Sequence, residues 1–280
     1  MMTNFEELLN KEIDLLEDST VKEAMRYSLL AGGKRLRPLM VYAVTKGYGI
    51  EAEIARPFAC ALEMIHTYSL IHDDLPAMDN DSLRRGKPTC HIQYGEANAI
   101  LAGDGLLTYA FEVMSKANVD SSIIVKGIQI LSKNAGASGM ILGQCLDVDD
   151  NTHMSFDELK RVHYYKTGCL FSAALTLGAI LANQDDSIIN QWDELGKKLG
   201  LAFQIQDDLL DVHKTAEELG KSTSDERNGK ATSVTILGED KATALMNELY
   251  QDCINQINNF EEFEASELIE LVKEVITRNK

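Results

Sequence analysis

Two groups of aspartates, far apart in the chain, are the residues best suited to chemistry. Each group has three members, namely Asp73, Asp74 and Asp79 in HDDLPAMD, and Asp207, Asp208 and Asp211 in QDDLLDV. Neighbouring carboxylates repel one another, and their pKa values rise unless a cation lies between them. Mg²⁺ prefers oxygen ligands and is commonly held by one or two carboxylates together with substrate phosphates. We therefore expect a metal–phosphate site between the two segments.

The spacing within each group predicts which carboxylates act together. Asp207 and Asp211 are four residues apart, so on a helix they share one face, whereas Asp208 points to the side. Their apolar flanks disfavour the alternative of a solvated acidic helix end. In the first group, Pro76 should end the helix and bring Asp79 back toward Asp73. Alone, that group could equally be a helix end with surface charges, but two such groups favour a metal site.

Basic residues accompany the acidic ones, although the net charge of the chain is −17. The segment GGKRLRP places Lys34 and Arg37 at a helix N-terminus, where free backbone N–H groups favour an anion. Other basic residues near the aspartates are Arg84, Arg85, Lys166, Lys221 and Lys230. Each of these alone is more often a surface charge. Together they suggest two diphosphate sites, one bound through metal and one free of it.

Composition excludes several other functions. The strongly acidic balance argues against a nucleic-acid surface, which needs a basic stripe. The five cysteines are scattered and odd in number, which is typical of reduced thiols in a cytoplasmic protein. The acidic, periodic N-terminal segment resembles neither a signal nor a transit peptide. No apolar run reaches membrane-spanning length without charge, so we expect no stable membrane insertion. Phosphate-binding P-loop, GxSxG and HExxH motifs are absent.

The hydrophobic periodicity is helical throughout. It predicts a long helix from about residue 57 to 74, followed by helices over roughly 97–117, 121–148, 156–182, 187–213, 240–258 and 265–278. Ser155 and Glu158 form a capping box that should begin the 156–182 helix. The stretches 79–95 and 214–232 appear irregular, and each follows an aspartate group. We expect an all-α fold, a large helical bundle that forms one domain over residues 1–280.

Six stretches resemble the short-chain trans-prenyl diphosphate synthases, and most closely the bacterial farnesyl type. They are GGKRLRP, EMIHTYSLIHDDLPAMDNDSLRRGKPTCH, YGEANAILAGDGLL, YYKTGCLFSAAL, GLAFQIQDDLLDV and GKSTSDERNGKAT. Together they span about three quarters of the chain. The resemblance implies about ten or more helices around a deep central cavity, usually in a homodimer. It also implies head-to-tail condensation of isopentenyl diphosphate with dimethylallyl and geranyl diphosphate through an allylic carbocation.

The resemblance further implies a role for each matching residue. About three Mg²⁺ ions would join the allylic diphosphate to the aspartates, with Asp73, Asp79 and Asp207 as main ligands and Asp74, Asp208 and Asp211 beside them. The isopentenyl diphosphate pocket maps to Gly33, Lys34, Arg37, His66 and Arg85. Contacts to the allylic diphosphate map to Arg84, Lys166, Lys221 and Lys230, and Thr167 and Gln204 map to positions that stabilise the cation. Among these, Arg84, Lys166, Thr167 and Gln204 would act in catalysis.

Product length depends on the helix before Asp73. Tyr68 and Ser69 precede Asp73 by five and four residues, about one helical turn below the metal site, so a growing chain would meet the Tyr68 ring first. This arrangement favours a C15 product, farnesyl diphosphate. The alternatives are a geranylgeranyl or geranyl diphosphate synthase with the same mechanism. A terpene cyclase would need no second diphosphate pocket, and a non-catalytic partner subunit would tend to lose one aspartate motif.

Overall fold

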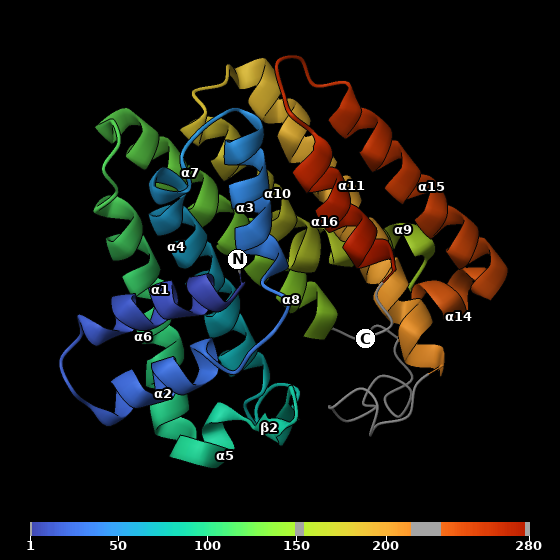
Figure 1. The fold of residues 1–280 in the computed structure, drawn as a ribbon. Helices are drawn as coiled ribbons and strands as arrows, with labels where there is room; N and C mark the ends of the chain where they lie inside the picture. The colour runs from blue at the N-terminus through green and yellow to red at the C-terminus, as the bar shows by residue number, and fades with distance from the viewer. Residues whose placement is uncertain (1, 149–153, 214–230, 278–280) are drawn as a thin grey trace.

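The structure is a computed structural model that describes residues 2–148, 154–213 and 231–277. Its helices, in chain order, are α1 (Met2–Asp14), α2 (Thr20–Leu29), α3 (Leu36–Gly47), α4 (Ala52–Asp73), α5 (Cys90–Tyr94), α6 (Glu96–Ser115), α7 (Ser121–Ala135), α8 (Met140–Val148), α9 (Phe156–His163), α10 (Cys169–Leu181), α11 (Asp186–His213), α14 (Ser233–Leu237), α15 (Glu239–Asn258) and α16 (Ser266–Ile276). A π-helical turn, Tyr164–Gly168, joins α9 to α10. The expected all-α fold is confirmed (Figure 1).

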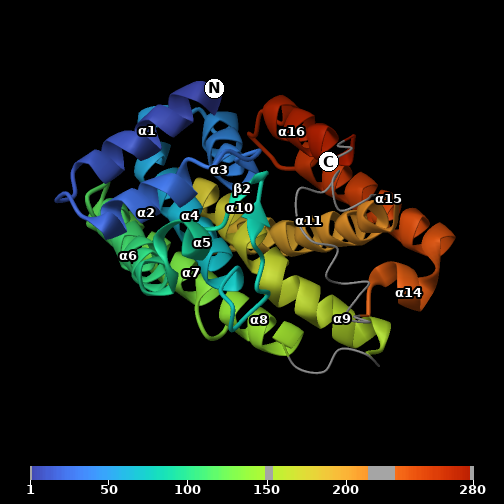
Figure 2. The same ribbon diagram turned by 90° about the horizontal axis from the view of Figure 1, so that it is seen from below.

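The most apolar helices occupy the middle of the molecule. Every residue of α10 is buried, and α4 buries most of its length. Helix α4 packs against α3 and α6, whereas α10 packs against α3, α7 and α11, and α15 covers α11. The C-terminal ends of α4 and α11 lie at the same end of the molecule, in the lower part of Figure 1. Figure 2 views that end directly.

A short hairpin follows α4 at this end of the molecule. Strand β1 (Leu83–Arg84) pairs antiparallel with β2 (Lys87–Pro88). The two residues between them, Arg85 and Gly86, have φ values of 53° and 74°, as a two-residue type I′ turn requires. The hairpin lies within a segment whose sequence predicts irregular structure. The hairpin thus fixes the backbone of both Arg84, at the end of β1, and Arg85, in the turn.

Two of the predicted helices differ from the structure. The expected helix over 121–148 is wrong, because α7 ends at Ala135 and α8 begins only at Met140. Glycines at 136 and 139 flank the break, and there the amide of Gly139 donates to the carbonyl of Gly136 at 2.9 Å. The predicted 156–182 helix is interrupted by the π-helical turn. The Ser155 capping box is confirmed at its start.

None of the helices that the structure describes is long and apolar enough to cross a membrane.

Candidate active site

The first aspartate motif has the turn that Pro76 predicts. Helix α4 ends at Asp73, and the amide of Asp79 donates to the carbonyl oxygen of Asp73 at 2.9 Å. The amide of Asn80 donates to the carbonyl of Leu75 at 3.1 Å. Asn80 itself has a φ of 53°, a left-handed conformation that asparagine tolerates better than most residues. The loop therefore curls back over the helix end and returns Asp79 to Asp73.

The Asp73 carboxylate has the properties of a ligand for a cation. It is half-buried at the edge of a cavity, and it has no hydrogen-bond or ion-pair partner in the described part of the chain. Burial raises its pKa to about 6; the Lys166 ammonium acts in the opposite direction, and Asp79 adds to the rise. An uncompensated carboxylate of this kind fits Mg²⁺, which is an oxygen-binding cation.

Asp74 faces a different partner. It is buried, and both of its carboxylate oxygens accept hydrogen bonds from Nε of Arg84 at 2.8 Å. The Nη2 group of Arg84 also contacts Asp74. Planar guanidinium groups suit such paired contacts with a carboxylate. In this structure Asp74 and Arg84 therefore hold each other, and the pair anchors the hairpin to the end of α4.

The three aspartates of the second motif also face different surroundings. All three lie in the last turns of α11. Asp208 is buried, and Oδ2 accepts a hydrogen bond from the Ser233 amide at 2.7 Å and lies 3.5 Å from Nε2 of His163. It thus holds the start of α14. Asp207 is only half-buried, and its charge acts on the guanidinium of Arg37, so it faces the basic segment before α3.

The π-helical turn holds two of the predicted catalytic residues. The Lys166 ammonium pairs with Asp147 of α8 at 2.6 Å. The Thr167 hydroxyl donates to Oε1 of Gln204 on α11 at 2.8 Å. A π-helical turn inserts one extra residue and often occurs at functional sites. Here it points adjacent side chains toward two different helices.

The predicted isopentenyl diphosphate pocket is a group of cationic side chains beside α4. Nη1 of Arg37 lies 3.3 Å from Nε2 of His66, and its guanidinium lies 5.0 Å from the centre of the Phe171 ring. Burial and the charge of Arg37 hold the pKa of His66 well below its usual value, so the imidazole is neutral. Arg85 contacts the carbonyl of Gly32. Gly33 has a φ of 116°, which side-chain-bearing residues rarely adopt, and a Cβ there would lie 2.5 Å from the Arg85 guanidinium and displace it.

A cavity of about 520 Å³ joins these groups. Its lining includes Arg37, His66, Asp73, Lys166 and Thr167, together with Tyr68 and Ser69, which lie between His66 and Asp73 on α4. The structure thus brings together most of the predicted residues. Lys221 and Lys230 lie outside the described residues. No three potential metal-binding side chains among the described residues are gathered into a ready-made metal site, but Mg²⁺ completes its shell with phosphate and water.

Sequence reasoning missed three residues that line this cavity or pair with its lining. Asp147 pairs with Lys166, and Nε2 of Gln144 is buried without a hydrogen-bond partner at the cavity wall. His72 packs edge-on against Tyr68, with ring centres 5.8 Å apart. The signal for the first two was a polar pair, Gln144 and Asp147, within an otherwise apolar helix. His72 gave no usable signal, because its contact depends on α6, where the imidazole meets Gly103 and the carbonyl of Ile100.

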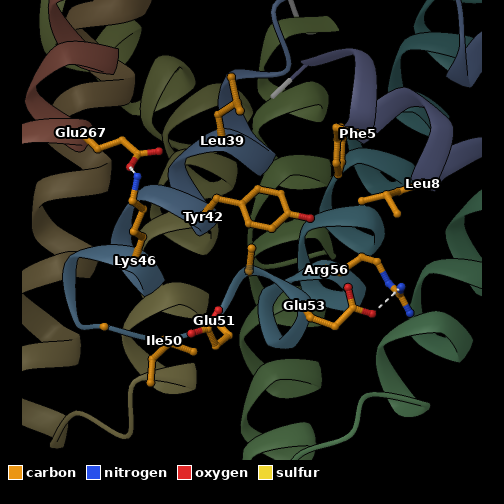
Figure 3. A pocket seen from close by; sticks show the side chains of 12 residues that line it. Phe5, Leu8, Leu39, Tyr42, Lys46, Ile50, Glu51, Glu53, Arg56 and Glu267 are labelled. Atoms are coloured by element: carbon orange, nitrogen blue, oxygen red, sulfur yellow. Dashed lines mark ion pairs between the residues drawn. The ribbon is translucent and has the colours of Figure 1, made fainter.

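A second cavity of about 620 Å³ lies elsewhere, between α1, α3, α16 and the start of α4. Figure 3 shows Tyr42 at its centre and an ion pair at either side, Lys46 with Glu267 and Arg56 with Glu53. None of the residues predicted for the site lines it. Its lining holds more acidic residues (Glu51, Glu53 and Glu267) than basic ones (Lys46 and Arg56), so it offers no cationic surface to a diphosphate.

Comparison with known proteins agrees with this geometry. The polyprenyl synthetase family profile matches residues 18–272. The farnesyl diphosphate synthase of Micrococcus luteus is 43% identical over 98% of this chain and 94% of its own length. The geranylgeranyl diphosphate synthase of Cyanophora paradoxa is also 43% identical, over 98% and 93%. A Helicobacter pylori geranyltransferase, solved with magnesium and isoprenyl diphosphate, superposes with a TM-score of 0.87 at 36% identity, covering 98% of this chain and 93% of its own.

The chain belongs to the polyprenyl synthetase family. Members of this family elongate prenyl chains, so the chain is an enzyme, a trans-prenyltransferase.

Proposed function

We propose that the enzyme condenses isopentenyl diphosphate head-to-tail, first with dimethylallyl and then with geranyl diphosphate, to give farnesyl diphosphate. The observation that carries this proposal is a cavity whose lining combines the Asp73 carboxylate and the cations Arg37 and Lys166 with Tyr68 and apolar side chains of α4 and α8. Such a cavity suits a substrate with an anionic head and an apolar chain that lengthens away from the head. The names of the bacterial relatives support the same product.

In this proposal Asp73, Asp79, Asp207 and Asp211 hold about three Mg²⁺ ions together with the allylic diphosphate. The unpartnered carboxylate of Asp73 and the return of Asp79 beside it support this assignment. Bound Mg²⁺ would withdraw charge from the diphosphate and favour its departure. Asp74 and Asp208 would support the site indirectly. Asp74 holds Arg84, and Asp208 holds the start of α14.

The cationic residues would divide between the two diphosphates. Lys166, on the same cavity as Asp73, and Arg84 would contact the allylic diphosphate, together with Lys221 and Lys230. The group around Arg37 would bind isopentenyl diphosphate without metal, and its members are Gly33, Lys34, Arg37, His66 and Arg85. Guanidinium forks and a helix N-terminus both suit a diphosphate. A neutral His66 can donate one hydrogen bond to it.

Thr167 and Gln204 would stabilise the allylic cation once the diphosphate has left. Their mutual hydrogen bond fixes both dipoles beside the cavity, and fixed dipoles stabilise developing charge more effectively than mobile water. The apolar walls contributed by α4 and α8 would exclude water, which would otherwise quench the cation. The departed diphosphate can take the proton that the new double bond releases, so no side-chain base is required.

Chain length would be set by Tyr68. Its ring is almost fully buried and is supported edge-on by His72, so it has little freedom to move aside. The relatives alone do not decide the product, because farnesyl and geranylgeranyl synthases are equally similar. A geranylgeranyl or geranyl diphosphate product, formed by the same chemistry, is the second candidate.

We also infer a homodimer. Helices α5, α6 and α7 are neighbours, and they carry large apolar side chains that are exposed in the single chain, namely Ile92, Ile100, Leu101 and Val125. A second copy that covers this surface would bury them. Light scattering of the purified protein tests this inference, and a monomeric mass at micromolar concentration would contradict it.

The assignment of the two diphosphate sites can be tested with two lysines near opposite ends of α3, Lys34 and Lys46. Lys34→Ala should raise the KM for isopentenyl diphosphate and leave the KM for geranyl diphosphate nearly unchanged. Lys46, in the last turn of α3, lines the second cavity instead. Lys46→Ala should therefore alter neither constant. Equal changes in both constants of Lys34→Ala would contradict the division of the sites. Loss of Mg²⁺ on chelation should stop turnover of every variant.

A further inference from the structure

A buried ion pair lies directly beneath the cationic group around Arg37. Nη1 of Arg35 lies 2.6 Å from Oε1 of Glu63, and the two side chains are 0% and 2% exposed. Removing two charges from water is costly, and a buried pair often contributes no net stability. A role outside stability is therefore a reasonable explanation for this pair.

Arg35 is turned away from the cavity by its backbone. It precedes α3 in a left-handed conformation, with φ of 52° and ψ of 32°. Nη2 donates to the carbonyl of Leu29 at 2.7 Å and contacts Glu6 at 3.2 Å. Its guanidinium thus joins α1, α2 and α4 in addition to its own helix. Arg37, only two residues further on, instead lines the active-site cavity.

The Glu63 carboxylate also acts electrostatically on Arg37, which lines the cavity. Burial lowers the pKa of Arg37 to about 10, and the Glu63 carboxylate is the first opposing influence. Glu63 acts on Arg85 in the same way. It also lies one helical turn before His66, which contacts Arg37. Nε of Arg37 is buried and has no hydrogen-bond partner among the described residues. A Glu63 carboxylate that lost Arg35 would therefore have the unpaired Nε–H of Arg37 as a replacement donor.

We propose that Arg35 is a positioning residue that occupies the Glu63 carboxylate, so that Arg37 remains turned toward the cavity and available to a diphosphate. The proposal rests on the proposed function in one respect, since it takes Arg37 as a ligand of isopentenyl diphosphate. Arg35 itself would touch no substrate. The two arginines of GGKRLRP thus have different tasks, because Arg35 neutralises the buried Glu63 carboxylate and Arg37 binds the anion.

The test compares a single variant with its double. Arg35→Met should leave Glu63 free to capture Arg37, and the KM for isopentenyl diphosphate should rise about tenfold or more, as expected when one partner of a buried charge pair is removed. The KM for geranyl diphosphate and kcat should change far less. Adding Glu63→Gln removes the competing charge, so the double variant should recover most of the lost affinity. Calorimetric titration with isopentenyl diphosphate gives the same comparison without turnover.

Two further variants separate positioning from folding. Glu53→Gln breaks the exposed pair with Arg56 on the same helix and should change neither KM. If Arg35→Met fails to fold, Arg35→Gln takes its place, because it removes the charge but keeps a side-chain hydrogen-bond donor. An unchanged KM for isopentenyl diphosphate in a folded Arg35 variant would overturn the proposal, and so would a double variant that recovers no affinity. If Arg37→Ala also leaves that KM unchanged, the assignment of the pocket has failed instead.

Discussion

The Thr167 hydroxyl donates to Oε1 of Gln204 at 2.8 Å and joins the π-helical turn to α11. The residue before Thr167 is Lys166. Burial lowers the pKa of its ammonium, but the charges of Asp147 and Asp73 outweigh that effect and raise the pKa above its usual value. Gln204 lies three residues before Asp207 on α11, so one turn of helix separates it from the second aspartate motif. This single hydrogen bond thus links the turn that carries Lys166 to the helix that carries the second aspartate motif.

The Thr167 hydroxyl should contribute to turnover more than to binding. Thr167→Val keeps the shape but removes the oriented dipole, and kcat should fall roughly tenfold or more, with small changes in both KM values. Thr167→Ser should restore most of the rate. As a control, Thr176→Val removes a buried hydroxyl that bonds only within α10 and should leave kcat close to normal. Steady-state kinetics with geranyl diphosphate decides between these outcomes.

Asp73 should reduce the stability of the protein without ligand while serving catalysis. Its folded pKa of about 6 lies above the ordinary value of 3.8. A carboxyl raised in this way destabilises the folded state above the folded pKa, and the penalty disappears below the unfolded value. Asp73→Asn should therefore raise the free energy of unfolding near neutral pH by roughly 1 to 3 kcal/mol. Turnover should fall by orders of magnitude.

Urea unfolding in a chelator checks this prediction at two pH values. The advantage of Asp73→Asn should be present at about pH 7.5 and much smaller at about pH 4, where the folded state holds the proton and the unfolded state holds it about half of the time. A variant that is less stable than the parent at the higher pH would show that Asp73 has a stabilising partner in the protein.

The adjacent residues Asp207 and Asp208 should respond differently to the same change. Asp207→Asn should lower kcat by roughly a hundredfold and raise the Mg²⁺ concentration needed for half-maximal rate. Asp208→Asn weakens the acceptor for the Ser233 amide. Its main effect should be to lower the free energy of unfolding by about 1 to 3 kcal/mol. Magnesium titrations of the two variants, side by side, measure the difference. Equal shifts in the Mg²⁺ requirement would mean that Asp208 is a ligand as well.

Tyr68 should set the length of the product. Tyr68→Ala removes the ring that closes the cavity and should extend the product beyond C15, whereas Tyr68→Phe keeps the ring and should keep the product. A bulkier residue at Ser69, which lines the same cavity, should shorten the product toward C10. Chromatography of the dephosphorylated products measures each result. If Tyr68→Ala still gives only C15, the floor of the cavity is formed by other residues.

Local sequence signals predicted much of the fold and of the site. Pro76 predicted the turn that returns Asp79, and Ser155 marked the start of α9. These features depend on residues a few positions apart, and the chain satisfies them without help from distant segments. The break at 136–139 was missed because apolar residues continue on both sides of it. Its two glycines were a signal that helical periodicity outweighed.

Pairings between distant segments were harder to predict. The Arg35–Glu63 pair joins residues 28 positions apart and the Lys166–Asp147 pair joins residues 19 apart. A sequence shows that such charges exist, but the packing of helices decides which ones meet. For the same reason GGKRLRP appeared as one cationic group, whereas the backbone turns Arg35 inward and Arg37 toward the cavity.

The most direct test of the central claim is a product assay with the purified protein. It contains Mg²⁺, isopentenyl diphosphate and either dimethylallyl or geranyl diphosphate, and it resolves the products by chain length. We expect Mg²⁺-dependent consumption of isopentenyl diphosphate and a dominant C15 diphosphate from both allylic substrates. A dominant C20 product would retain the chemistry and refute Tyr68 as the limit. A folded protein that consumes no isopentenyl diphosphate would contradict the account as a whole.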